Sequence, residues 1–219
     1  MRQLIIIGIV YGLICPLSQC TSDKKVDTEA VKNEIRSREI KKVTEAEIVS
    51  KVLELGKSVA LGTKQTLGKN LQQALQGGGV ENAIDFCSLE AMPLVDSLSE
   101  NYNADIRRVS LKVRNPKDYP SELEKQILEA YKFQLNDSLG LQANVQPIGE
   151  DQYLFTQPIM VEGALCLTCH GKPENGLLKE TNDFIKSKYP KDQATGYEIG
   201  DLRGMWSITF PKKKVIQSM

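Results

Sequence analysis

The sequence predicts an α+β domain whose strands form an antiparallel sheet. Residues 44–98 carry apolar side chains near helical spacing, whereas residues 105–113 alternate with the period of a strand. Residues 143–161 have the pattern of a hairpin that turns near Gly-Glu-Asp. Two helices followed by a mixed run of strands and helices, without internal repeats, are typical of the α+β class.

The N-terminal 20 residues (1–20) resemble a lipoprotein-type signal peptide. Arg2 precedes an apolar run at residues 4–13, which has signal-peptide length and is too short to span a membrane comfortably. The following PLSQC resembles a lipobox, in which Cys20 receives lipid and becomes the mature N-terminus, although Gln19 replaces the usual Gly or Ala. We therefore expect an exported protein, lipid-anchored on the periplasmic side of a bacterial membrane. An ordinary cleaved signal and a single anchor helix are the alternatives.

A charged linker is predicted at residues 21–43, because this segment is polar and alternates in charge. The predicted domain then occupies residues 44–219. Its chain has an ordinary globular composition, with 41% apolar and 26% charged residues. The formal net charge of zero argues against a nucleic-acid partner, because proteins that bind nucleic acid usually show a basic excess.

Two helices open the predicted domain. Thr44 and Glu47 form a capping-box pattern at the start of the first helix, and the glycines at residues 77–79 end it. The second helix is predicted at about residues 80–98. Pro93 lies inside this pattern and should kink the helix, because proline removes a backbone donor and clashes with the preceding turn.

The remaining elements follow in order. A strand at residues 105–113 leads to a third helix at residues 121–139, where Ser121 and Glu124 form a second capping box. The later elements are the hairpin at residues 143–161, a short helix at residues 182–189 and a final strand at residues 202–210.

A haem attachment pattern, Cys-x-x-Cys-His, lies in the stretch ALCLTCHG. Cys166 and Cys169 have the spacing at which two thiols add to the two vinyl groups of a porphyrin. The adjacent His170 is then held where its imidazole reaches the iron. Haem of this kind is attached outside the cytoplasm, in agreement with the export signal. The pattern predicts one covalent haem c per chain.

Three other uses of these residues compete with haem. A thioredoxin-like redox pair should begin a helix after a βαβ strand, and no such unit precedes the motif. Cys87 together with the motif completes a Cys₃His set for zinc, although the neighbours Cys169 and His170 do not easily point at one tetrahedral ion. A plain disulfide between Cys166 and Cys169 is the third alternative.

The second axial position of a haem iron needs a ligand other than histidine, because His170 is the only histidine in the chain. Methionine is common in electron carriers. The methionine candidates are Met92, Met160 and Met205. Cys87 lies on the apolar stripe of the second helix and is the cysteine left over once Cys15 leaves with the signal. A buried free cysteine is also ordinary core filling, so the pattern leaves both residue types open.

Four segments together resemble a bacterial family of exported c-type haem proteins, formerly a domain of unknown function. They read AIDFCS, RRVSLKVRNP, CLTCHG and YPKDQATGYEIGDLRGMWSI. The resemblance runs from about Thr44 to the last strand. It implies a PAS-like fold, with an antiparallel sheet, flanking helices and a long N-terminal helix.

The resemblance also implies a ligand set. Cys87 becomes the distal ligand of the iron, opposite His170. Arg107, Arg108 and Arg114 match polar positions of the family motifs, and one of them could pair a haem propionate because arginine favours carboxylates. The alternative for each arginine is a structural salt bridge.

These observations predict a membrane-tethered periplasmic c-type haem protein that acts as a redox or small-ligand sensor. The implied partners are a signalling or redox protein and a diatomic gas. A periplasmic electron-transfer cytochrome is the alternative function. We do not expect an enzyme of the peroxidase kind, because the single histidine is already used as the proximal ligand.

Overall fold

The computed structural model describes residues 27–38, 43–173 and 176–219. The chain divides into two units, residues 1–41 and residues 42–219. The predicted signal peptide, with Cys20, lies outside the described residues. Among the residues that are described, no helix has both the length and the apolar character that a membrane span requires.

The first unit contains one described helix, α1 (Thr28–Arg38), which lies within the predicted charged linker. The side chain of Asp27 starts this helix, since its carboxylate accepts hydrogen bonds from the backbone N–H groups of Glu29 and Ala30 at 3.0 and 3.1 Å. The side chains described in α1 are exposed to solvent.

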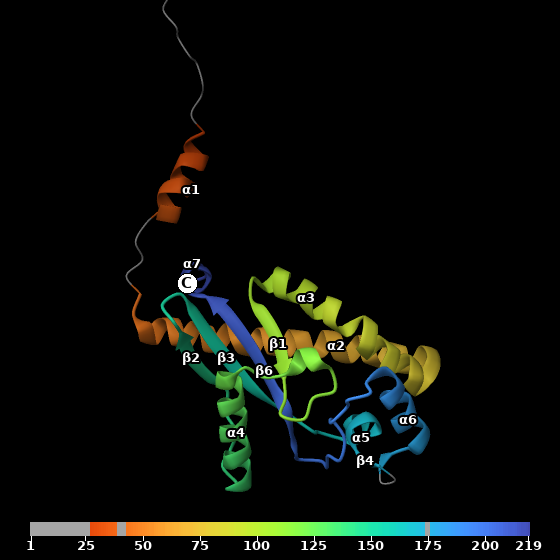
Figure 1. The fold of residues 1–219 in the computed structure, drawn as a ribbon. Coiled ribbons are helices and arrows are strands. Elements are labelled where there is room, and N and C mark those ends of the chain that lie inside the picture. The colour runs from red at the N-terminus through yellow and green to blue at the C-terminus, as the bar shows by residue number, and fades with distance from the viewer. Residues whose placement is uncertain (1–26, 39–42, 174–175) are drawn as a thin grey trace, which may run out of the picture. The chain divides into compact units, whose positions relative to one another are not determined.

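The second unit is built on a four-stranded antiparallel sheet with the strand order β1-β6-β3-β2 (Figure 1). The strands are β1 (Asp105–Val109), β2 (Asn144–Ile148), β3 (Gln152–Met160) and β6 (Leu202–Pro211). Together with a long N-terminal helix, this sheet confirms the predicted α+β class. The comparison with PAS domains stays a prediction.

Helices cover both faces of the sheet. The helices α2 (Glu45–Leu89) and α3 (Ala91–Tyr102) pack on one face around Val52, Phe155 and Ile208, which are fully buried. Gly56 allows α2 to approach the sheet, because a Cβ atom there would lie 2.2 Å from the ring of Phe155. On the other face, α4 (Glu122–Asn136) packs around Leu128, Leu154 and Met205.

The two predicted capping boxes are confirmed, and the second predicted helix is interrupted in the turn before Pro93, as its clash with that turn predicts. Thr44 and Ser121 both form capping boxes with the glutamate three residues on. The span labelled α2 is interrupted at the predicted glycine stop, because the backbone is non-helical at Gly78 and at Gly79, where φ is +72°. The chain then breaks at Glu90, before Pro93. Proline fits there because the first-turn N–H groups of α3 need no helical acceptor.

The first strand is shorter than predicted. It pairs with β6 up to Val109, and the next residue leaves the ladder. The N–H of Ser110 bonds to the carbonyl oxygen of Asp118 at 3.3 Å, and its hydroxyl bonds to the carbonyl oxygen of Arg203 at 2.7 Å. These bonds satisfy the polar groups of Ser110 outside the sheet, so the strand ends there.

The segment between β3 and β6 folds at one end of the sheet. Its small core joins Ile84 of α2 to Leu177 and Ile185. The elements of this segment are α5 (Ala164–His170), β4 (Lys172–Pro173), β5 (Gly176–Leu177) and α6 (Lys179–Lys188). The sequence reasoning missed α5, the β4–β5 pair, the short helix η1 (Pro116–Asp118) and the last helix α7 (Lys212–Gln217).

Candidate functional site

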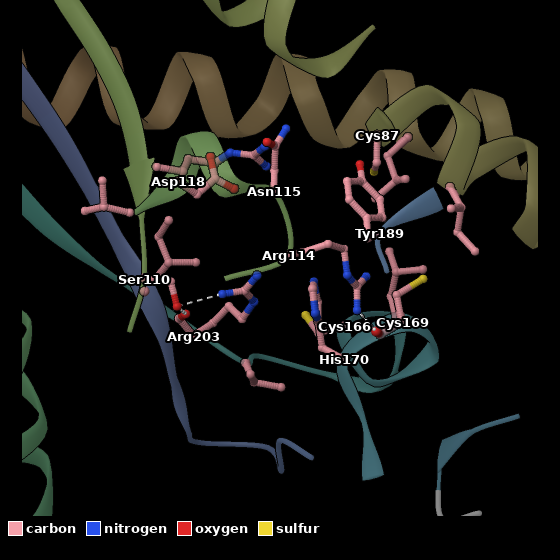
Figure 2. Close-up of a pocket in the computed structure, with 18 of the residues that line it drawn as sticks. Cys87, Ser110, Arg114, Asn115, Asp118, Cys166, Cys169, His170, Tyr189 and Arg203 are labelled. Carbon is pink, nitrogen blue, oxygen red and sulfur yellow. Dashed lines mark hydrogen bonds between the residues drawn. The ribbon is translucent and has the colours of Figure 1, made fainter. Parts of the chain in front are cut away.

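A cavity of about 330 Å³ lies where the end of α2, the segment after β1 and α5 meet (Figure 2). This volume is within the range of cofactor and small-molecule sites, which is roughly 300–1,000 Å³. Cys87, Cys166, Cys169 and His170 all line the cavity. Residues separated by more than 80 positions in the chain therefore face one space.

Helix α5 presents the Cys-x-x-Cys-His residues on one face. Cys166, Cys169 and His170 stand at positions i, i+3 and i+4, which are neighbours on a helix surface. Gly171 ends the helix directly after His170, and its N–H bonds to the carbonyl oxygen of Leu167 at 2.8 Å. A Cβ atom at Gly171 would lie 2.6 Å from that oxygen, so only glycine fits the close turn.

His170 is held as a neutral imidazole with one nitrogen available. Its Nδ1 lies 2.7 Å from the carbonyl oxygen of Ala194, a contact in which Nδ1 donates its proton. Burial, followed by the charges of Arg203 and Arg114, holds the pKa of His170 well below its usual value. The lone pair on Nε2 therefore stays free, which is the form of histidine that ligates metals.

Arg114 fastens the motif helix to the segment before β6. Its Nε donates to Asp192 Oδ1 at 3.0 Å, and its Nη2 donates to the carbonyl oxygen of Cys169 at 2.6 Å. Further contacts of Nη2 reach Asp192 Oδ2 and the carbonyl oxygen of Ala194, both at 3.3 Å. The side chain of Asp192 is only 2% exposed, so this is a buried ion pair. It sets the position of Ala194, which in turn orients His170.

Cys87 enters the cavity from the last turns of α2, on the wall opposite α5 in Figure 2. Burial raises the pKa of the Cys87 thiol, although the charges of Arg108 and Arg114 oppose this shift. Burial likewise raises the pKa of Cys169. Tyr189 lies beside Cys87 in the view, and burial and the nearby Cys87 raise the pKa of its hydroxyl to about 12.

The three predicted arginines separate into two groups. Arg108 and Arg114 line the cavity, whereas Arg107 does not. Arg107 donates from Nη1 to both carboxylate oxygens of Glu124, at 3.0 and 2.9 Å, and from Nη2 to the carbonyl oxygen of Tyr119. The structure thus gives Arg107 the alternative role of a structural salt bridge, on the side of the sheet covered by α4.

The methionine candidates also separate. Met160 lines the cavity. Met205 is fully buried in the core between the sheet and α4, and Met92 lies in the first turn of α3 and is not among the lining residues. Met160 is therefore the one methionine candidate that shares the cavity lining with Cys87 and His170.

The zinc and disulfide alternatives find no geometric support in the described part of the chain. Within it, no three side chains of the His, Cys, Asp and Glu types converge to hold a metal ion on their own. Cys87, Cys166 and Cys169 are free thiols.

Five polar lining residues were missed by the sequence reasoning. They are Ser110, Asn115, Asp118, Tyr189 and Arg203. Ser110 directly follows β1, Arg203 lies near the start of β6, Asn115 and Asp118 lie at and within η1, and Tyr189 follows α6. A strand pattern does not show which of its terminal residues turns toward a cavity, so no sequence signal pointed to them.

The family model described as Tll0287-like matches residues 24–211. The chain belongs to the Tll0287-like family. This membership confirms the family resemblance inferred from the four sequence segments. The chain is also similar to the crystal structure of the cyanobacterial heme-protein Tll0287, with 29% identity and a TM-score of 0.46. That match covers 69% of this chain and 94% of the other chain. No curated protein matches the chain.

Proposed function

We propose that this member of the Tll0287-like family binds one covalent haem c in the cavity and acts as a redox or small-ligand sensor. The observation that supports the proposal best is the convergence of the Cys-x-x-Cys-His residues and Cys87 on one cavity. The family resemblance of the four sequence segments, which implies a haem with histidine and cysteine as axial ligands, agrees with it.

The residues present fit such a group. Cys166 and Cys169 are free thiols on the face of α5 that lines the cavity, as thioether attachment requires. His170 presents an unprotonated Nε2, because its Nδ1 is engaged by Ala194. Cys87 lies on the opposite wall and is the proposed distal residue, with Met160 as the competing side chain. A bound haem would supply one-electron redox chemistry and an iron site for diatomic gases.

The sensor function is favoured by the position of Cys87. This residue lies two positions before the end of α2, where the chain breaks before α3 begins. A ligand held at such a junction can pass a change at the iron to the helix that carries it. An electron-transfer cytochrome is the second candidate, and it would keep both axial residues in place in both redox states. A haem enzyme is not proposed, because the single histidine is used on one face.

The proposed setting is the periplasmic side of a bacterial membrane. The signal-like residues 1–20 and the lipobox-like Cys20 support export and lipid anchoring. A signalling or redox protein and a diatomic gas are the proposed partners, and nucleic acid is not. Cys20→Ser should move the protein from the membrane fraction to the soluble fraction. Continued membrane association of that variant would place the anchor elsewhere.

The test of haem attachment is chemical. Purified wild-type protein should retain its colour in acidified acetone and give a c-type pyridine haemochrome spectrum. Cys166→Ser combined with Cys169→Ser should release the colour under the same treatment. Extraction of the colour from the wild-type protein, or zinc in place of iron, would refute the proposal.

The test of the sensor function uses Cys87→Ala. The ferric wild-type protein should show a low-spin thiolate signature by paramagnetic resonance, and the variant should lose it. The reduced wild-type protein should bind carbon monoxide readily. An unchanged ferric spectrum in Cys87→Ala would remove this residue from the iron, and a ferrous protein that refuses carbon monoxide would favour the electron carrier.

A further inference from the structure

The cavity has a polar end that the proposed attachment and axial residues do not use. Ser110, Asp118 and Arg203 lie at this end, on the left of Figure 2, whereas Cys87 and Cys169 lie on the right. The guanidinium group of Arg203 extends from β6 toward the interior of the cavity in this view.

Arg203 has a hydrogen-bonding group without a partner. Its Nη1 donates to Ser110 Oγ at 2.9 Å and to the carbonyl oxygen of Lys112 at 3.2 Å. Its Nε is buried and has no hydrogen-bond partner among the described residues. An unpaired buried donor is unfavourable, and more so when the group is charged, because it has lost its hydrogen bonds to water without gaining others. The guanidinium group of Arg203 lines the cavity, and Nη1 is its one nitrogen with a hydrogen-bond partner among the described residues, so an acceptor in the cavity would pair a donor that these residues leave open.

The charges around the cavity are also unbalanced. Arg114 is neutralised by Asp192, but no carboxylate of the described residues forms an ion pair with Arg203 or with Arg108. Asp118 is the one acid among the described residues that line the cavity. Burial raises the pKa of Asp118, and the charges of Arg108 and Arg203 oppose this shift, so one carboxylate faces two arginines. The polar end therefore has an excess of positive charge.

We propose that Arg203 binds a propionate carboxylate of the haem. This inference rests on the proposed function, because haem supplies two carboxylates on the porphyrin edge. A carboxylate beside Arg203 would accept a hydrogen bond from its guanidinium group and balance the positive charge. The planar guanidinium suits this contact, because its donors match the geometry of a carboxylate. Arg203 would then orient the porphyrin so that its propionate edge faces the polar end.

A purely structural role for Arg203 predicts a different pattern of porphyrin affinities. Arg203 holds the carbonyl oxygen of Lys112 and lies 5.5 Å from the ring of Tyr197, so it also contributes to the local fold. A structural residue would affect any porphyrin in the cavity equally. A carboxylate-binding residue affects only a porphyrin with free carboxylates.

The experiment compares ferric haem with its dimethyl ester, which lacks the carboxylate charges. Both are titrated into the full chain carrying Cys166→Ala and Cys169→Ala, so that binding is reversible, and absorbance reports the Kd. Adding Arg203→Gln should weaken the binding of haem roughly ten- to hundredfold, the value of one charged hydrogen bond, and leave that of the ester unchanged. Arg107→Gln is the matched control, because its arginine is paired outside the cavity, and it should leave both affinities unchanged.

The outcomes distinguish failure of the carboxylate role of Arg203 from failure of the proposed haem binding. Equal weakening of haem and ester by Arg203→Gln, or no weakening of either, would overturn the carboxylate role while leaving haem binding intact. Absence of covalent haem from the wild-type protein would overturn the proposed function and the inference with it. The chain with intact Arg203 gives a second test that does not depend on folding of the variant. It should prefer haem to the ester, and equal affinities would also overturn the inference.

Discussion

Arg107 and Arg114 lie seven residues apart, yet they belong to different regions of the molecule. Arg107 is in β1 and pairs with Glu124 at the start of α4, where its side chain is 36% exposed. Arg114 follows β1, pairs with Asp192 and supports the motif helix, and its side chain is only 11% exposed. One arginine joins a helix to the sheet, and the other joins two segments of the candidate site. Similar residues in one motif thus serve unrelated purposes.

The two arginines should also differ in their contribution to stability, because their carboxylate partners have different surroundings. Glu124 also accepts hydrogen bonds from the hydroxyl of Ser207 at 2.6 Å and from the N–H of Ser121 at 2.7 Å. Asp192 has a backbone donor, the N–H of Ala194, but its side chain is almost fully buried. Loss of Arg114 should therefore cost more than loss of Arg107.

The largest effect is expected for Arg114→Ala. Removing one partner of a buried ion pair leaves a buried charge uncompensated, which costs about 3–5 kcal/mol of unfolding free energy. The measurement is urea unfolding followed by circular dichroism. Arg114→Ala combined with Asp192→Ala should recover part of the loss, since the unpaired carboxylate is then absent. A loss below that of Arg107→Ala would contradict the comparison.

Arg107→Ala should cost about 1–2 kcal/mol, because the pair is partly exposed and Glu124 keeps its other donors. The spectrum of any bound haem should not change, since Arg107 lies outside the cavity. Urea unfolding and the haem absorption spectrum together test this expectation. A shifted haem spectrum in this variant would return Arg107 to the site.

Ser121→Ala should have a smaller effect, about 1 kcal/mol, because it removes one half of the capping box at the start of α4. Glu124 would then lose an organising neighbour but keep Arg107 and Ser207. Thermal unfolding is the measurement, and Ser138→Ala, near the other end of α4, is the matched control. Equal effects of the two substitutions would show that the cap is unimportant.

The smallest expected effect is a pH dependence in the α4 region. Burial opposes the charge of Glu124, but hydrogen bonds from Ser207 and Ser121 and the charge of Arg107 outweigh it and lower its pKa below the ordinary 4.5. At pH values above 4.5, the ionised Glu124 therefore stabilises the folded protein. This stabilisation is lost as the pH falls from 4.5 toward the lower pKa that Glu124 has in the folded protein. The difference in unfolding free energy between wild type and Glu124→Gln should become smaller as the pH falls over this range. A difference that becomes larger would mean that the fold raises the pKa of Glu124 and does not lower it.

Much of the fold was accessible from local pattern. The capping boxes at Thr44 and Ser121, the period-two strands and the hairpin depend on neighbours in sequence, and these predictions are confirmed by the structure. The interruption predicted for Pro93 is found at Glu90, in the turn before the proline, and Pro93 itself lies in the first turn of α3.

The residues of the candidate site likewise divide into those that a local pattern predicts and those that it does not. The motif at Cys166, Cys169 and His170 is visible in the sequence because the chemistry requires contiguous residues. Arg203 was not visible, because its place in the cavity depends on how β6 lies against the segment after β1. The contrast between Arg107 and Arg114 likewise depends on partners, Glu124 and Asp192, that are 17 and 78 residues away.

The backbone break at Gly78 and Gly79 has a consequence for local stability. It separates the ten residues 80–89, which include Cys87, from the long part of α2, and the chain breaks again at Glu90. Isolated helices this short are marginal in water, so the segment depends on its packing, which joins Ile84 to the small core of Leu177 and Ile185 and Phe86 to the main core at the sheet. Its amide hydrogens should exchange with solvent through local opening of this short segment, faster than the amide hydrogens of the sheet.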